Sequence, residues 1–121
     1  MPRPILVVDD SDSVRRLISS TLRIAGYDTV EAADGQAALG VARSTAPAAV
    51  ITDQNMPRLD GIGFIRAFRK LPGSAGVPVI FLSTENADNL KQKAREAGAI
   101  GWMTKPFDDK KLLSVVKKVL G

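Results

Sequence analysis

The sequence lacks two of the residue types on which much enzyme chemistry depends, because its 121 residues include no cysteine and no histidine. The absence of cysteine excludes a disulfide framework, a thiolate metal site and a cysteine nucleophile, and it fits a reducing cytoplasm. The absence of histidine removes the commonest general base near neutral pH and the commonest zinc ligand. Any chemistry must therefore use carboxylates, hydroxyls and lysine, and a bound metal would be a hard cation held by oxygen atoms.

Long apolar runs are missing as well. The chain starts Met1-Pro2-Arg3-Pro4 and continues with an apolar run at 5–8, which is too short for a signal peptide or a membrane span. We therefore expect a cytoplasmic protein without a membrane partner. The formal charge is +4, but the cations are spread over amphipathic segments with a single Trp and no recognisable nucleic-acid motif, so no nucleic-acid partner is expected.

Apolar residues make up 45% of the chain, enough for one ordinary core, and the length leaves no room for a second domain. Five short runs rich in β-branched residues recur, at 5–8, 28–32, 49–52, 77–82 and 100–103. A segment with helical spacing of apolar residues follows each run. This alternation predicts a single α/β domain over residues 1–121, with a doubly wound (βα)5 parallel sheet of five strands and helices on both faces.

Capping residues mark the expected helices. Gly26 closes the first, Asp34 begins the second, Asp60 and Gly61 begin the third as cap and turn, and Asn86 or Asp88 begins the fourth. These helices end at about residues 25, 43, 70 and 98, and a fifth runs from after residue 106 to 120. The first helix should bury a stripe of Val14, Leu17, Ile18, Thr21, Leu22 and Ala25.

Polar residues stand at the carboxyl ends of these strands, where ligands bind in doubly wound sheets. They are Asp9 and Asp10 after the first run, Asp53 after the third, Ser83 and Thr84 after the fourth, and Lys105 after the fifth. Three carboxylates that converge at the end of a buried sheet repel one another unless a cation lies among them. Mg²⁺ would remove that conflict, since it prefers oxygen ligands and leaves coordination positions open for a phosphoryl oxygen.

Asp10 and Asp53 are the first-choice ligands for such an ion. Lys105 adds a movable positive charge of the kind that binds phosphate, and Ser83 offers a hydroxyl that can donate to a phosphoryl oxygen. In this setting a carboxylate is a reasonable nucleophile that forms an acyl phosphate. Asp53 is placed best, because it follows an apolar strand directly and precedes a loop, 54–57, that could offer a backbone carbonyl to the metal.

Four segments of the chain resemble one known family. The segments are Val7-Val8-Asp9-Asp10-Ser11 with Arg15, Asp53-Gln54-Asn55-Met56-Pro57-Arg58-Leu59-Asp60-Gly61, Pro78-Val79-Ile80-Phe81-Leu82-Ser83, and Lys105-Pro106-Phe107. They resemble the response-regulator receiver domains of two-component signalling, and among these the stand-alone chemotaxis type. The resemblance spans essentially the whole chain and implies the flavodoxin-like strand order 2-1-3-4-5, of which CheY is itself a standard example.

The resemblance implies a role for the acidic residues. Asp9 and Asp10 would form the acidic pocket for Mg²⁺, with Mn²⁺ as a substitute, and Asp53 would be both a metal ligand and the phosphoacceptor. Asn55 would lend its main-chain oxygen to the same metal. The domain would accept a phosphoryl group from the phosphohistidine of a sensor histidine kinase and catalyse its own phosphotransfer and dephosphorylation, without being an enzyme that turns over a substrate.

The resemblance also implies a switch. Ser83 stands where the family has its switch hydroxyl, Lys105 where it has its phosphate-sensing lysine, and Trp102 where it has its switch aromatic. The bond between Lys105 and Pro106 is expected to be cis. Thr84 departs from the pattern, because the family usually has a small Ala or Gly there, and its bulk could hinder water or a phosphatase and slow self-dephosphorylation.

Partners follow from the same resemblance. Since the chain contains no histidine, the phosphodonor must be another protein or a small phosphodonor. A downstream target protein, with the flagellar motor as a candidate, would read the phosphorylated form through the face of the last two helices, and a phosphatase is a further candidate partner. That face carries Lys91, Lys93, Lys110, Lys111, Lys117 and Lys118. The basic charge is unusual for the chemotaxis type.

Three other interpretations stay open. A Mg²⁺-dependent phosphatase or phosphotransferase of the haloacid dehalogenase type also uses an Asp nucleophile and a lysine, but it would want a second acid two residues after Asp53, where Asn55 stands. A flavodoxin-like cofactor binder would need a loop that accepts phosphate after the first strand, where Asp9, Asp10 and Asp12 repel it. A receiver-like module could act by protein contact alone. Taken singly, the same residues could be helix caps and turns.

Overall fold

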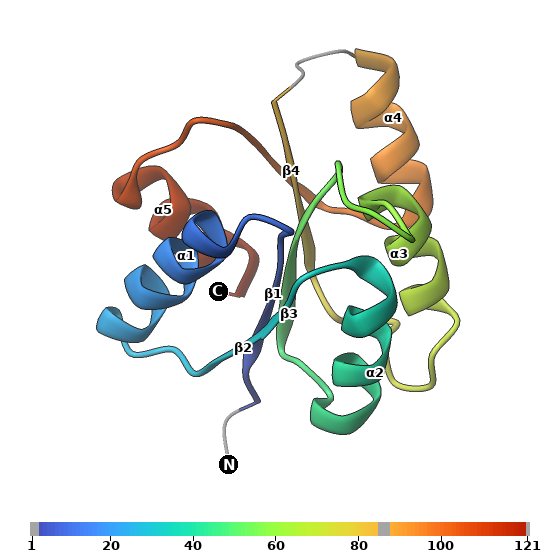
Figure 1. Ribbon diagram of the computed structural model, residues 1–121, viewed down its shortest axis with the longest axis horizontal. Helices are drawn as coiled ribbons and strands as arrows, with labels where there is room; N and C mark the ends of the chain where they lie inside the picture. The colour runs from blue at the N-terminus through green and yellow to red at the C-terminus, as the bar shows by residue number, and fades with distance from the viewer. Residues whose placement is uncertain (1–2, 85–87, 121) are drawn as a thin grey trace.

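Strands and helices alternate along the chain. The computed structural model describes residues 3–84 and 88–120. The elements are β1 (Ile5–Val8), α1 (Asp12–Ile24), β2 (Thr29–Ala32), α2 (Gly35–Thr45), β3 (Ala49–Asp53), α3 (Gly61–Arg69), β4 (Val79–Ser83), α4 (Asp88–Ala97), β5 (Gly101–Thr104) and α5 (Asp109–Leu120). The five strands pair in parallel in the order β2-β1-β3-β4-β5 (Figure 1). The predicted (βα)5 fold and its strand order are confirmed.

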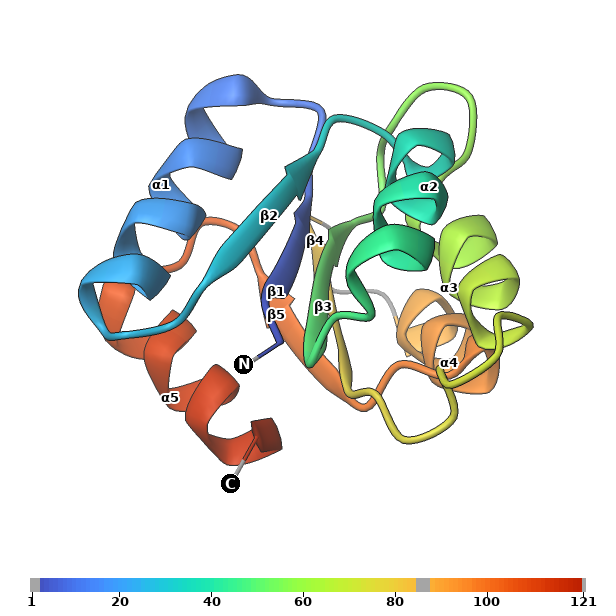
Figure 2. The same ribbon diagram turned by 90° about the horizontal axis from the view of Figure 1, so that it is seen from below.

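Helices cover both faces of the sheet. Figure 2 shows α1 and α5 on one face and α2, α3 and α4 on the other, as right-handed crossovers between parallel strands require. Each face has its own hydrophobic core. Phe64 and Phe81 belong to the core under α2, α3 and α4, and Ile51 and Leu112 belong to the core under α1 and α5. Because the central strands β1, β3 and β4 are buried along their whole length, they are mainly apolar rather than alternating in polarity.

The helix caps follow the sequence signals. Asp34 accepts the N–H of Ala37 at 2.8 Å and caps α2, while Asp60 accepts the N–H of Gly63 at 2.8 Å and caps α3. Gly26 follows α1 with a φ of 101°. Glycine reaches this left-handed region without the steric penalty of a side chain, so it ends the helix as predicted.

The buried stripe of α1 differs from the predicted one. Leu17 is 56% exposed, Ala25 is exposed beyond the end of the helix, and Ser19 takes a buried position. The reason is helix geometry, since successive residues lie about 100° apart around the axis. With Ile18 buried, Leu17 and Ser19 lie on opposite sides of it around the helix axis, so they cannot both occupy the buried stripe, and Ser19 occupies it instead of Leu17.

Strand boundaries shift by one or two residues. β4 begins at Val79 rather than at Val77, because the N–H of Val77 is donated to the carbonyl of a preceding turn at 3.0 Å. Asn86, one of two predicted starts for the fourth helix, lies outside the described residues. Among the residues that the structure describes, no helix is long and apolar enough to cross a membrane.

Candidate functional site

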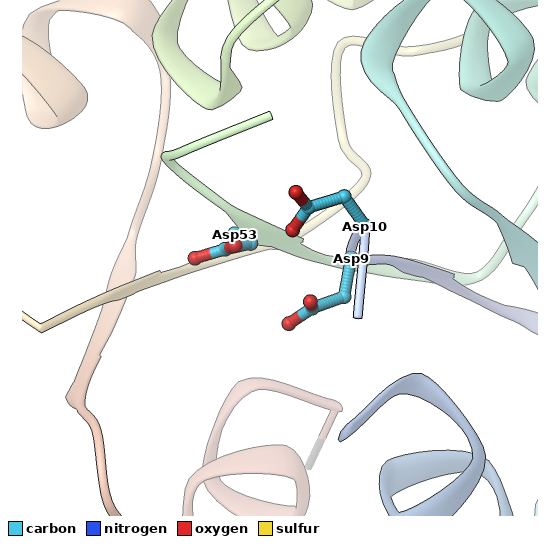
Figure 3. Close-up of side chains that lie close together, drawn as sticks. All are labelled: Asp9, Asp10 and Asp53. Carbon is cyan, nitrogen blue, oxygen red and sulfur yellow. The ribbon is translucent and has the colours of Figure 1, made fainter. Parts of the chain in front are cut away.

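Three carboxyl groups meet at the carboxyl ends of two neighbouring strands. Asp9 and Asp10 follow β1, and Asp53 is the last residue of β3. One carboxylate oxygen from each residue lies within 4.8 Å of the other two, and Figure 3 shows the side chains gathered at the strand ends. Asp9 and Asp53 are buried, at 0% and 5% exposure, whereas Asp10 is exposed. The structure therefore brings the three predicted acidic residues together.

Lys105 reaches this cluster from the connection between β5 and α5. Its Nζ lies 2.8 Å from Oδ2 of Asp9 and 3.2 Å from Oδ1 of Asp53. The N–H of Lys105 donates to the carbonyl of Ser83 at 2.8 Å, which ties the ends of β4 and β5 together. The peptide bond between Lys105 and Pro106 is cis, as predicted. One ammonium group therefore bridges carboxylates from two strands.

These neighbouring charges shift two pKa values. Burial raises the pKa of Asp53, the negative charge of Asp9 raises it further, and Lys105 opposes both effects. Burial lowers the pKa of Lys105, but the hydrogen bonds and charges of Asp9 and Asp53 together outweigh burial and raise it. Asp53 is thus more basic than an exposed aspartate and Lys105 stays charged, which suits an oxygen nucleophile beside a phosphate-binding cation.

The donor set of the cluster fits Mg²⁺. All three side chains offer carboxylate oxygens, and a chain without histidine and cysteine has no imidazole or thiolate to compete with them. Asp9 already accepts the N–H of Ser11 at 2.9 Å and the ammonium of Lys105 at 2.8 Å, which leaves Asp10 and Asp53 as the freer ligands. When ionised, three carboxylates face one ammonium, so a divalent cation would balance the charge of the site.

The connection between β3 and α3 is held by contacts that the sequence did not predict. A Cβ atom at Gly61 would overlap the carbonyl oxygen of Asp53, so the start of α3 packs directly on the backbone of that residue. Gly61 is therefore required by this close approach rather than by the predicted turn. The side-chain oxygen of Gln54 accepts the N–H of Ile62 at 2.9 Å and fixes the same junction. Asn55 is exposed in this connection, and its role as a main-chain ligand stays a prediction.

Two arginines support the strand ends from outside the cluster. Nη1 of Arg15 donates to the carbonyl of Asp9 at 2.8 Å, and its Nε to Glu31 at 3.1 Å. Arg58, which has a left-handed φ of 70°, donates to Asp34 at 2.7 Å and links the β3–α3 connection to the start of α2. The resemblance included both arginines in its matching segments but gave neither a role.

The predicted switch residues occupy neighbouring strands. Ser83 is buried at the end of β4, and Thr84 follows it with an exposed side chain. The ring of Trp102 packs against Phe81, with 5.0 Å between the ring centroids. The Lys91 ammonium lies 5.2 Å from the Trp102 centroid. Their roles in switching stay predictions.

The fold and the cluster together define a flavodoxin-like α/β domain with an acidic site at its strand ends. Residues 5–117 match the family described as Response regulator receiver domain. The structure of the Vibrio cholerae chemotaxis protein CheY4 is similar, with a TM-score of 0.95 and 38% identity over 99% of this chain and 100% of that one. A response regulator protein from Burkholderia multivorans has a TM-score of 0.81 and 45% identity over 100% and 97%. The chain belongs to the response regulator receiver domain family, whose members are signalling domains of two-component systems.

Curated relatives add a second kind of protein. The probable transcriptional regulator ycf27 of Porphyridium aerugineum is 38% identical over 116 residues, which cover 96% of this chain and 47% of that protein. The alkaline phosphatase synthesis transcriptional regulatory protein PhoP of Bacillus subtilis is 34% identical over 120 residues, or 99% and 49%. The chain spans about half the length of these relatives. They share the receiver class with CheY4 but differ from it in described function.

Proposed function

We propose that this chain is a phosphorylation-dependent switch that accepts a phosphoryl group on Asp53 with the help of Mg²⁺. The observation that carries the proposal is the position of the Lys105 ammonium, within 3.2 Å of the carboxylates of Asp9 and Asp53, in a cluster of three acidic side chains. A nucleophile, a cation site and a phosphate-binding charge thus share one place. Membership of the receiver family supports the same function.

The phosphodonor in this proposal is the phosphohistidine of a sensor histidine kinase. An oxygen of Asp53 attacks the phosphorus atom, an O–P bond forms as the P–N bond breaks, and the released imidazole takes up a proton. Lys105 turns its ammonium toward the phosphoryl oxygens and so stabilises their charge. The domain itself provides these groups, so the kinase supplies only the phosphorylated imidazole.

Asp10 and Asp53 are the side chains that would hold Mg²⁺, or Mn²⁺ in its place, with Asp9 beside them and a main-chain oxygen of Asn55 as a further ligand. When bound, the ion supplies positive charge that neutralises the phosphoryl oxygens. Ser83, buried at the end of β4, would donate its hydroxyl to the phosphoryl group of the modified Asp53.

The signal would leave through the edge of the sheet formed by β5. Figure 2 shows α4 and α5 beside this edge on opposite faces of the sheet. Trp102 lies on β5, and its repacking would change this surface and hence the binding of a partner protein. Charge reversal at Lys91 and Lys111, exposed or partly exposed cations beside Trp102, should weaken that binding. Unchanged binding of kinase and target would remove this face from the proposal.

Chemotaxis is the first output that we propose, with the flagellar motor as the candidate target, because CheY4 is similar over its whole length. A role in transcription is the second candidate, since the curated relatives are transcriptional regulators. The swimming behaviour of cells that lack this protein would separate the two. Altered turning supports chemotaxis, and altered transcripts with normal swimming support the second output.

Intact mass measurement after incubation with Mg²⁺ and a small acyl-phosphate donor tests the acceptor. Wild type should gain one phosphoryl group and Asp53→Asn none. Asp12→Asn is the matched control, because Asp12 is a nearby aspartate whose side chain is 70% exposed, outside the cluster. Absence of any gain in wild type would overturn the proposal in favour of a contact module, and turnover of phosphate esters that Asp53→Asn abolishes would revive the enzyme interpretation. Trp102 fluorescence reports the repacking in parallel.

A further inference from the structure

A hollow of about 310 Å³ lies at the other end of the sheet, between the last turns of α2 and α3. Its volume falls near the lower end of the range of small-molecule sites, about 300–1,000 Å³. Apolar side chains of Ala42, Phe68, Leu71 and Val77 line it. Figure 1 shows the surrounding α2–β3 and α3–β4 connections at the end of the molecule away from the loops that follow β1 and β3. The hollow is therefore separate from the acidic site.

Two guanidinium groups border this hollow without a negative partner. Arg3 and Arg43 both line it and both are exposed. Neither forms an ion pair with any residue in the described part of the chain, and the described lining includes no acidic residue. The hollow thus combines an apolar surface with uncompensated positive charge, which attracts an anion.

Ser74 adds a hydrogen-bonding group that lacks a partner. The residue lines the hollow and is only 4% exposed. Over residues 3–84 and 88–120, its hydroxyl is one of two buried side-chain polar atoms without a hydrogen bond, although buried hydroxyls are usually satisfied. Its carbonyl accepts a hydrogen bond from Arg69 at 2.6 Å, so the residue is held in place. An oxygen atom in the hollow would supply the missing partner.

We propose that this hollow binds a small organic carboxylate with an apolar body. The apolar lining buries the body, Arg3 and Arg43 pair with the carboxylate, and Ser74 donates its hydroxyl to one of the ligand oxygens. A neutral apolar molecule would leave both cations unused, and an inorganic anion would leave the apolar lining uncovered. The site lies at the amino end of β3, whose five residues span about 13 Å, while Asp53 lies at its carboxyl end.

Octanoate is a suitable probe, with octanol as its neutral counterpart, and amide chemical shifts of the full chain are the readout. Octanoate should give saturable shifts at residues 43–47 and 71–77, and octanol should bind at least about tenfold more weakly. The double variant Arg3→Gln/Arg43→Gln should lose about tenfold in octanoate affinity, and Ser74→Ala about threefold. Lys117→Gln is the matched control, since Lys117 is an exposed cation on α5 across the sheet.

Several outcomes would overturn the proposal. Equal binding of octanol and octanoate would reduce the hollow to a nonspecific apolar surface, and unchanged octanoate binding in the double variant would remove the arginines from it. Shifts centred on the acidic site would place the ligand elsewhere. Ser74→Ala keeps the test independent of the arginines, because it removes an unsatisfied hydroxyl and leaves folding intact. All variants should still gain a phosphoryl group, so failure here does not depend on the proposed function.

Discussion

The two ends of the sheet hold charged side chains in opposite ways. At the carboxyl end, the buried carboxylates of Asp9 and Asp53 share one ammonium, and the pKa of Asp53 is raised. At the amino end, Nη1 and Nη2 of Arg69 donate to two backbone carbonyls, those of Ser74 and Gly98, at 2.6 and 2.7 Å. The first arrangement keeps a like-charge repulsion that a bound cation would relieve, whereas in the second, backbone carbonyls hold the guanidinium of Arg69 in place. The carboxyl end is therefore suited to change and the amino end to rigidity.

Arg69→Met tests the amino end of the sheet and should have the largest effect on stability. Its loss leaves two carbonyls without their charged donor, so we expect the free energy of unfolding to fall by about 3 kcal/mol in urea titrations. Arg66→Met on the same helix is the control, because Arg66 is exposed and has no ion pair with the residues that the structure describes. It should change stability by less than about 0.5 kcal/mol. Equal losses in both variants would mean that the carbonyl contacts contribute little.

Gly61→Ala tests how tightly the carboxyl end of the sheet is packed. The new Cβ would meet the carbonyl of Asp53, so either the start of α3 or the strand end must move. We expect a loss of about 2 kcal/mol in the free energy of unfolding and slower phosphoryl gain. Gly40→Ala is the opposite case, since a Cβ there meets nothing within 4 Å in the middle of α2, and it should add about 0.5–1 kcal/mol. Similar changes in both glycine variants would contradict the close-approach argument.

The carboxyl end could be predicted from the sequence because the fold forces its residues together. Asp9 follows β1, Asp53 ends β3 and Lys105 follows β5, and the carboxyl ends of all strands in a parallel sheet lie at the same edge. Gly61 could not be interpreted in the same way, since an Asp-Gly pair gives the same signal for a turn and for a close backbone approach. The structure was needed to separate these cases.

The amino end left almost no signal in the sequence. The partners of Arg69 are backbone carbonyls, which every residue carries, so no residue type announces them. The exposure of Leu17 was also missed, because a stripe assigned by spacing has an uncertain centre and Ser19 does not look like a core residue. Where a contact depends on backbone or on helix rotation, residue types alone do not determine it.

Asp53→Asn measures how much the burial of the Asp53 charge and its repulsion by Asp9 destabilise the metal-free protein. Since the folded-state pKa of Asp53 is raised, folding favours its protonated form, and this contribution to stability is lost as pH rises from the ordinary value of 3.8 through the folded-state value. The free energy of unfolding of the variant should therefore exceed that of wild type by on the order of 1 kcal/mol at pH 7. Urea titrations with a chelator should show the difference shrinking as the pH falls through the folded-state value of Asp53 and levelling off below about pH 4. A wild type more stable than the variant at pH 7 would contradict the sign.

Thr84→Ala should have the smallest effect and addresses rate rather than stability. Thr84 is exposed directly after the buried Ser83, so its replacement should change the free energy of unfolding by less than about 0.5 kcal/mol. If its bulk hinders water, the acyl phosphate should decay about threefold faster in the variant, equal to ~0.7 kcal/mol in the barrier. Thr45→Ala, in the last turn of α2 at the amino end, should leave the decay unchanged. The control is matched because Thr45 lies at the opposite end of the sheet from the acyl phosphate, too far away to alter its hydrolysis. Equal decay of Thr84→Ala and wild type would contradict the proposed hindrance by Thr84.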